Sequence, residues 1–317
     1  MDITTLTSKK SLIWCAIILI IFILLAFFPL YAPGYPTIFL SSILMYVILT
    51  VSWVMFSGST GYMSLATAAF FGVGIYTSAI LGKVLPLPLV IGMGGVASFC
   101  LALLVGTLTL RLRGIYFAIF TFGLVMLMAH SLLFWELHVT GTRGRFVIVM
   151  DCNPIYYYLL GILVLLLVTA YLIKRSRFGL ALQSIGQEED AAAHTGVNVT
   201  MLKVTTFAIS AFFMGTAGAV MATKWTYIDP FIAFNPFYSF MPVVMAIFGG
   251  MGQLYGPIIG AVILTYLEEI LITRFAEVYM LIFGSILVIA ILYLPNGLIG
   301  IIGKLWKGKS GTKHADT

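Results

Sequence analysis

The sequence predicts an all-α protein, a polytopic transmembrane helical bundle of about ten spans. The first observation is the scarcity of charge: of 317 residues, 61% are hydrophobic and 9% are charged. Soluble domains carry roughly 25% charged residues, so this chain has too few charges to cover a water-facing surface. The second observation is that the apolar residues stand in unbroken runs. A membrane β-barrel would instead need strands of about ten residues with alternating polarity.

Ten apolar segments predict spans, each of which needs about twenty helical residues. The first follows Lys9 and Lys10 and resembles a signal sequence, but no small-residue cleavage motif follows it, so we expect a retained span. The segments 62–81 and 237–251 are rich in Gly, Ser and Thr, and we expect broken or re-entrant structure there. The predicted spans are 12–29, 38–56, 62–81, 84–108, 115–135, 156–173, 203–222, 237–251, 254–272 and 278–294.

The positions of Lys and Arg predict the orientation of these spans. With a cytoplasmic N-terminus and ten crossings, twelve of the seventeen basic residues fall inside, as the positive-inside rule expects. Both termini are then cytoplasmic, and this bias explains the net charge of +6 without nucleic acid as a partner. We expect one membrane domain over 1–303 and a short basic tail over 304–317.

Ionisable residues are nearly absent from the centres of the predicted spans. His130, Glu136 and His138 lie towards or beyond the outer end of the fifth span, and Glu268 and Glu269 lie at the outer end of the ninth. We interpret them as interfacial side chains that reach water rather than as a proton relay. The three cysteines have no close spacing, so we expect no metal site.

The tail contains a formal match to the phosphate-binding loop pattern, from Gly303 to Ser310. That motif works between a strand and a helix N-terminus, whereas a predicted membrane span precedes this one and only 311–317 follow. We interpret the match as accidental and expect no cofactor on this chain. If ATP drives the protein, partner subunits bind ATP and magnesium and hydrolyse the ATP.

Small residues are dense in 58–78 and recur as glycines near 249–260. Small residues let helices approach closely, and Ser and Thr give a pathway polarity without charge. We favour helix packing for Gly252, Gly256 and Gly260 and a translocation path for 58–78. The candidate path residues are Ser64, Thr67, Gly72, Gly74, Thr77, Gly249, Gly250 and Gly252.

One polar segment, Arg177–Asn198, separates the sixth and seventh predicted spans. It holds three of the eleven acidic residues, at 188–190. Apolar residues at i, i+4 and i+7 from Phe178 share one helical face, and an alanine run is followed by Gly196, which is typical of a helix end. This pattern predicts two short helices on the inner membrane surface, with a small-residue patch for another protein. A solvated surface loop is the alternative.

At this segment the sequence resembles the permease of a bacterial ABC importer. In that class an inner loop carries Glu-x-Ala-Ala-x-x-x-Gly and docks in a groove of the ATPase, and residues 189–196 fit this pattern. The nearer resemblance is to the LivM-type subunit of the branched-chain amino acid permease family, through five blocks in the same order. These blocks are GYMSLATAAFFGVGIY from Gly61, RLRGIYFAIFTF from Arg111, Arg177–Ala222, GGMGQLYGPIIG from Gly249 and PNGLIG from Pro295.

The resemblance implies the function and the partners. The chain would form part of the path for branched-chain or related amino acids in a bacterial or archaeal cytoplasmic membrane. Its partners would be a second permease subunit, two cytoplasmic ATPases and an extracytoplasmic solute-binding protein. ATP binding would move a coupling loop at about 174–202 and so switch the path. The implied coupling residues are Arg177, Phe178, Gly179, Leu182, Glu189, Ala191, Ala192 and Gly196.

Two departures from the family pattern leave the solute open. The family commonly has Gly-His where this chain has Ala66-Thr67, and the loop Thr140–Arg145 carries two additional positive charges. Urea, short amides and small organic acids are therefore alternatives. An ion-coupled secondary transporter, which would work without partner chains, is an alternative from another class. A membrane-embedded enzyme would need His, Asp, Glu or Cys clustered at one depth, and the sequence has no such cluster.

Overall fold

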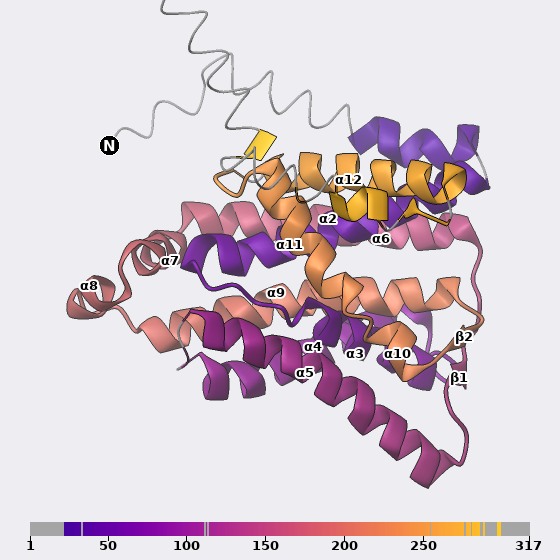
Figure 1. Cartoon of the computed structure of the whole chain (residues 1–317), viewed down its shortest axis with the longest axis horizontal. Helices are drawn as coiled ribbons and strands as arrows, with labels where there is room; N and C mark the ends of the chain where they lie inside the picture. Colours follow the sequence, from indigo (N-terminus) through magenta and orange to yellow (C-terminus); the bar gives the residue numbers. More distant parts are fainter. Residues whose placement is uncertain are drawn as a thin grey trace, which may run out of the picture.

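A computed structural model describes residues 22–298 except 33, 111, 113, 254, 276, 280, 286–287 and 289–296. It is a helical bundle (Figure 1), as predicted. Within the described residues, seven helices are long and apolar enough to cross a membrane, and two apolar helices are shorter. The count of ten is not decided, because much of the first and tenth predicted spans lies outside the described residues. The tail with its Gly303–Ser310 motif lies outside them too.

The described elements follow one another with short connections. After an apolar helix at Phe22–Tyr31 come α2 (Tyr35–Thr60), α3 (Thr67–Leu81), α4 (Leu87–Thr109), α5 (Ile115–Trp135), a π-helical turn (Glu136–Thr140), β1 (Arg145–Phe146) and α6 (Cys152–Arg175). Then follow α7 (Arg177–Gln187), α8 (Glu189–His194), α9 (Val199–Met221), a 3₁₀ turn (Ala222–Lys224), β2 (Tyr227–Ile228), α10 (Pro230–Ala233), α11 (Phe237–Gly249) and α12 (Tyr255–Arg274).

The bundle has two distinct ends (Figure 1). At one, which we call the coupling end, lie α7 and α8. At the other, the ribbon end, β1 pairs antiparallel with β2, with Arg145 opposite Ile228. The sequence did not predict this ribbon. The long helices run between these two ends (Figure 1).

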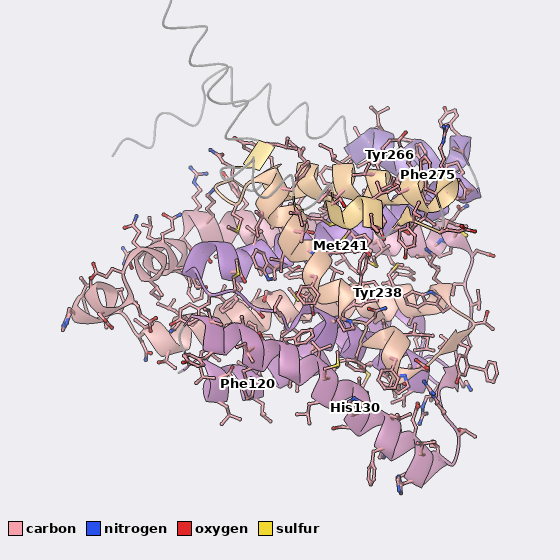
Figure 2. The ribbon with its side chains drawn as sticks, viewed as in Figure 1. Phe120, His130, Tyr238, Met241, Tyr266 and Phe275 are labelled. Carbon is pink, nitrogen blue, oxygen red and sulfur yellow. The ribbon has the colours of Figure 1, made fainter. Side chains whose placement is uncertain are left out.

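Helices α2 and α9 form the centre of the bundle. Their most apolar windows are 78% and 83% buried, whereas that of α5 is only 28% buried. Figure 2 shows Phe120 and His130 along α5, and both side chains are exposed. A membrane-spanning helix satisfies its own backbone hydrogen bonds, so it does not need protein on every side. The exposed face of α5 is therefore compatible with contact to lipid or to another membrane protein.

Glycines make the closest contacts between the central helices. A Cβ added to Gly74 of α3 would lie 2.0 Å from the carbonyl oxygen of Gly215 in α9, and one on Gly218 would lie 2.1 Å from that of Phe71. In membranes, small residues drive helix association because they let backbones approach. Candidate path residue Gly74 therefore lies in a helix contact within this chain.

The glycines near 249–260 behave in two ways. A Cβ on Gly249 would lie 2.0 Å from the carbonyl oxygen of Gly256, and one on Gly260 would lie 2.1 Å from that of Met245. These residues pack α11 against α12, as predicted for Gly256 and Gly260. The packing prediction is wrong for Gly252, which is exposed in the turn between the helices with no described atom within 4 Å of its Cβ position.

The predicted span 62–81 is broken. Helix α2 ends at Thr60, Gly61 adopts a left-handed conformation with φ of 75°, and residues 62–66 are not helical. The helix that follows, α3, has 15 residues, which span about 22 Å at 1.5 Å per residue. That is shorter than the roughly 30 Å hydrocarbon core, so α3 needs the preceding non-helical segment to complete a crossing.

At the ribbon end the structure corrects the interpretation of Glu136. We expected this side chain to reach water, but it is fully buried. One carboxylate oxygen accepts a hydrogen bond from the backbone N–H of Gly144 at 2.8 Å, and the other lies 3.4 Å from Nε of Arg145. Nearby, Arg143 pairs with Asp229 at 2.9 Å. Two positive charges that looked unusual in the sequence therefore anchor the loop between α5 and α6.

We predict that Glu136→Ala destabilises the protein by about 2–4 kcal/mol, because it strands the charge of Arg145 and the N–H of Gly144. Thermal unfolding of purified protein in detergent measures this effect. Removing both charges in Glu136→Ala/Arg145→Leu should restore part of the loss. If the double variant is no more stable than Glu136→Ala, the ion pair does not cause the effect.

Candidate functional site

The coupling end begins with a tight turn between α6 and α7. Ser176 caps α7, because its hydroxyl oxygen accepts a hydrogen bond from the N–H of Gly179 at 3.3 Å. A Cβ on Gly179 would lie 2.2 Å from the carbonyl oxygen of Ile173. Only glycine allows this approach of α7 to α6, which gives the predicted coupling residue Gly179 a structural reason.

Helix α7 lies against α2 through one apolar face. Leu182 and Ile185 are buried, and Phe178 is half-buried, as the sequence pattern predicted. A Cβ on Gly186 would lie 2.4 Å from the carbonyl oxygen of Ser59, so α7 touches the last turn of α2 directly. Arg177 is exposed at the start of α7. The two short helices predicted for the polar segment are thus present, and the first rests on the membrane bundle.

Helix α8 presents small residues outward. Ala191, Ala193 and His194 are exposed, whereas Ala192 is buried. Gly196 follows the helix with φ of 83°, a left-handed conformation that favours glycine. The exposed alanines leave a small-residue surface that another chain can approach closely.

Glu189, at the start of α8, points into the helical bundle. Its carboxylate lies 2.7 Å from Nζ of Lys203 in α9 and accepts a hydrogen bond from the hydroxyl of Tyr62 at 2.5 Å. Lys203 also donates to the Tyr62 hydroxyl at 3.1 Å and lies 4.4 Å from the centre of its ring. We call these three residues the coupling triad. It joins the polar segment, the central helix α9 and the residue that follows Gly61.

The coupling triad is buried enough to matter energetically. The side chain of Lys203 is 2% exposed and that of Glu189 is 21% exposed. Removing one partner of a buried pair costs about 3–5 kcal/mol, because the other charge stays desolvated without compensation. From the sequence alone, Lys203 is one of the twelve basic residues predicted on the cytoplasmic side, and no pattern singles out Tyr62. The available signal was a lysine at the start of an otherwise apolar span.

The non-helical segment 61–66 is held by side chains from three helices. Trp53 of α2 donates its ring N–H to the carbonyl oxygen of Ser64 at 2.7 Å. Thr121 of α5 accepts from the N–H of Leu65 at 2.9 Å, and Ser239 of α11 donates to the carbonyl oxygen of Leu65 at 2.7 Å. Irregular backbone at membrane depth needs such partners, and in transporters it occurs where it is buried or lines a cavity.

The other predicted path residues lie near this segment or in helix contacts. Ser64 and Thr67 are buried, and the Thr67 hydroxyl has no hydrogen-bond partner within the described residues. Thr77 donates to the carbonyl oxygen of Val73, and Gly72 packs against the ring of Phe234. Gly250 adopts a φ of 100° where α11 ends. A path lining for these residues stays a prediction.

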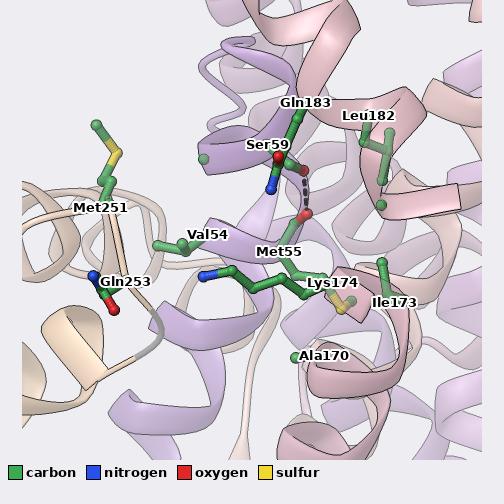
Figure 3. A pocket seen from close by; sticks show the side chains of 13 residues that line it. Val54, Met55, Ser59, Ala170, Ile173, Lys174, Leu182, Gln183, Met251 and Gln253 are labelled. Atoms are coloured by element: carbon green, nitrogen blue, oxygen red, sulfur yellow. Dashed lines mark hydrogen bonds between the residues drawn. The ribbon is translucent and has the colours of Figure 1, made fainter. Parts of the chain in front are cut away.

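A pocket of about 120 Å³ lies beside α7 (Figure 3). Its walls come from α2, α6, α7 and the turn after α11. Figure 3 shows Lys174 extending across it towards Val54, with Gln183 above. The Ser59 hydroxyl donates within α2, to the carbonyl oxygen of Met55 at 2.6 Å. The packing of α7 against the bundle therefore leaves a cavity on one side. The close glycine contacts of α7 with α6 and α2 lie beside this cavity.

Comparison with known proteins identifies the family. The family described as "Branched-chain amino acid transport system / permease component" matches residues 35–291. The chain belongs to this family. It is 28% identical to the high-affinity branched-chain amino acid transport system permease protein LivM of Salmonella typhimurium over 84% of this chain and 71% of that protein.

Two further relatives extend the comparison. LivM of Escherichia coli is 26% identical over 86% of this chain and 72% of that protein. The permease protein LivH of Salmonella typhimurium is 25% identical over 51% of this chain and 52% of that protein. No solved structure matches the chain. The family membership agrees with the predicted resemblance and with a transport subunit that performs no covalent chemistry.

Proposed function

We propose that this chain is one permease subunit of an ATP-driven importer for branched-chain or related amino acids. The observation that carries the proposal is the family match over 35–291, together with the names of the LivM relatives. The coupling triad supports it, because an energy-coupled permease needs a firm connection between its docking helix and its membrane helices. A second permease resembling LivH, two ATPases and a solute-binding protein complete the proposed complex.

The triad suggests how coupling works. An ATPase that grips the exposed alanines of α8 moves Glu189, and the ion pair to Lys203 carries that movement into α9. The hydrogen bond to Tyr62 carries it into the segment 61–66, which is not braced by helical hydrogen bonds. ATP binding then shifts the population of path conformations, because the docked helix fits one of them better.

Reconstitution tests the proposed function. Proteoliposomes with this chain, a LivH-like second permease, both ATPases and the binding protein should accumulate leucine only with ATP. Vesicles with this chain alone should show no uptake driven by sodium or proton gradients. Uptake by the chain alone under such a gradient would replace the proposal with a secondary transporter. ATP-driven uptake of urea but not of leucine would keep the class and change the solute.

We predict the membrane orientation from the same arrangement. Gln187 and Thr142 are both exposed, at the coupling end and the ribbon end respectively. In a background without native cysteines, Gln187→Cys should react with an impermeant maleimide only from the cytoplasm, and Thr142→Cys only from outside. Labelling of Thr142→Cys from the cytoplasm would show that the orientation is the reverse of the predicted one.

A further inference from the structure

A second pocket lies at the ribbon end, away from the coupling triad. It has a volume of about 170 Å³ and lies between α2, the 3₁₀ turn after α9, α11 and α12. Drug-sized ligands occupy pockets of roughly 300–1,000 Å³, so this one suits a smaller solute. Its walls are Ser42, Met45, Tyr46, Met221, Lys224, Trp225, Tyr238, Thr265, Glu268, Glu269 and Ile272. Figure 2 labels Tyr238 in this part of the bundle.

The charges in this pocket are of both signs and do not neutralise one another by contact. Among the described residues, no ion pair joins Lys224 to Glu268 or Glu269. Lys224 donates to the hydroxyl of Ser42 at 3.1 Å, and Glu269 accepts from the hydroxyl of Tyr35. Glu268 has no hydrogen bond within the described part of the chain. Lys224 and Glu268 are both half-buried. Burying a charge is costly unless it is paired, so two such charges without an ion pair point to a ligand that completes them.

A buried hydroxyl also lacks a partner here. Thr265 is 4% exposed, it lines the pocket, and its hydroxyl has no hydrogen-bond partner within the described residues. A buried polar group without a partner costs roughly 1–3 kcal/mol. Met45 and Met221 also line the pocket; both are buried and give it an apolar wall. Polarisable, flexible methionines accept aliphatic groups of different shapes.

We propose that this pocket is a binding subsite for a small zwitterionic amino acid with an aliphatic side chain. Glu268 accepts hydrogen bonds from the ligand's ammonium group, and Lys224 and Thr265 donate to its carboxylate. The aliphatic side chain contacts Met45 and Met221. The proposal rests on the proposed function, and it adds a site in the permease itself, separate from recognition by any solute-binding protein.

The test measures binding without the binding protein, so that only the membrane complex contributes affinity. Radiolabelled leucine is titrated onto the purified permease–ATPase complex in detergent. Lys224→Met and Glu268→Gln should each raise the dissociation constant at least tenfold, and Thr265→Val should raise it about threefold. The matched controls Lys83→Met and Glu277→Gln change exposed residues outside this pocket and should leave it unchanged.

Analogues assign each charge to its ligand group. Leucinamide lacks the carboxylate and 4-methylpentanoate lacks the ammonium group, so both should compete poorly with leucine on the unmodified complex. Lys224→Met should abolish the preference for leucine over leucinamide and keep the preference for leucine over 4-methylpentanoate. Glu268→Gln should do the reverse. Lys224→Arg, which keeps the charge, should retain most of the affinity and guards against a misfolded Lys224→Met variant.

The outcomes separate the two proposals. Suppose that the reconstituted importer takes up leucine, but the purified complex binds no leucine, or Glu268→Gln and Glu277→Gln bind it equally well. Either result would overturn the subsite and leave the proposed function in place. An importer that takes up no amino acid at all would overturn both. Loss of affinity in Glu268→Gln and Lys224→Met with the paired analogue pattern supports the subsite.

Discussion

Reversing the charge of Lys203 by Lys203→Glu is expected to lower ATP-driven uptake at least tenfold. The new carboxylate would face Glu189 where an ammonium group now lies 2.7 Å away. Losing one partner of a buried pair costs about 3–5 kcal/mol, and partial exposure of Glu189 lowers this figure. Because about 1.4 kcal/mol already changes a rate tenfold, we expect at least a tenfold loss of uptake. Uptake into proteoliposomes and stimulation of ATPase activity by substrate measure the loss.

The charge-swapped pair separates coupling from folding. Glu189→Lys alone should fail like Lys203→Glu, and Glu189→Lys/Lys203→Glu should recover a substantial part of the uptake. Glu188→Lys is the matched control, because Glu188 is the adjacent exposed residue and makes no side-chain cap bond. Tyr62→Phe should lower uptake less, because it removes the hydroxyl, with its hydrogen bonds to Glu189 and Lys203, but keeps the ring and the ion pair. Equal uptake in Glu188→Lys and Glu189→Lys would show that the triad does not transmit movement.

Gly74→Val is expected to prevent assembly of the central helices. Its Cβ would lie 2.0 Å from the Gly215 carbonyl oxygen, and backbone atoms cannot move aside as a flexible side chain can. Overpacking a well-filled core costs typically 1–3 kcal/mol, and a backbone clash at this distance exceeds that range. We expect loss of the monodisperse protein in size-exclusion chromatography, or a thermal unfolding transition that falls by more than that of any surface variant.

The same substitution at Gly161 is the control for Gly74→Val. Gly161 lies in α6 with no described atom within 4 Å of its Cβ position, so Gly161→Val should behave like the unmodified protein. Equal unfolding temperatures for the two variants would mean that α3 and α9 do not pack as described. A normally folded Gly74→Val variant that cannot transport would instead support the path assignment for Gly74.

Much of the fold could be predicted because its signals are local. Hydropathy runs predict membrane helices, since the hydrocarbon core leaves backbone groups no other partner. The broken segment at 62–81 was predictable from its Gly, Ser and Thr content, and α7 from the spacing of its apolar residues. The start of α9 was predicted four residues late, because the cap at Asn198, which accepts from the N–H of Met201, matters more than hydropathy there.

The site was less predictable, because it depends on pairs that are far apart in the chain. Tyr62 and Lys203 are separated by 141 positions, and no sequence spacing signals their contact. In the sequence, Glu136 looked interfacial because it directly follows the predicted apolar span 115–135. Its burial follows from a turn that brings Gly144 and Arg145 back onto it.

The amino-acid sequence by itself determined that the chain lives in a bilayer, where its helices lie, and that one polar segment carries two short helices. These properties follow from the solvation of single side chains and of the local backbone. Only the tertiary structure decided which charges meet, Glu189 with Lys203 and Glu136 with Arg145, and which line one pocket without forming an ion pair, Lys224 and Glu268. In a membrane of low dielectric such charges are tolerable only with specific partners, and helix packing alone brings those partners together.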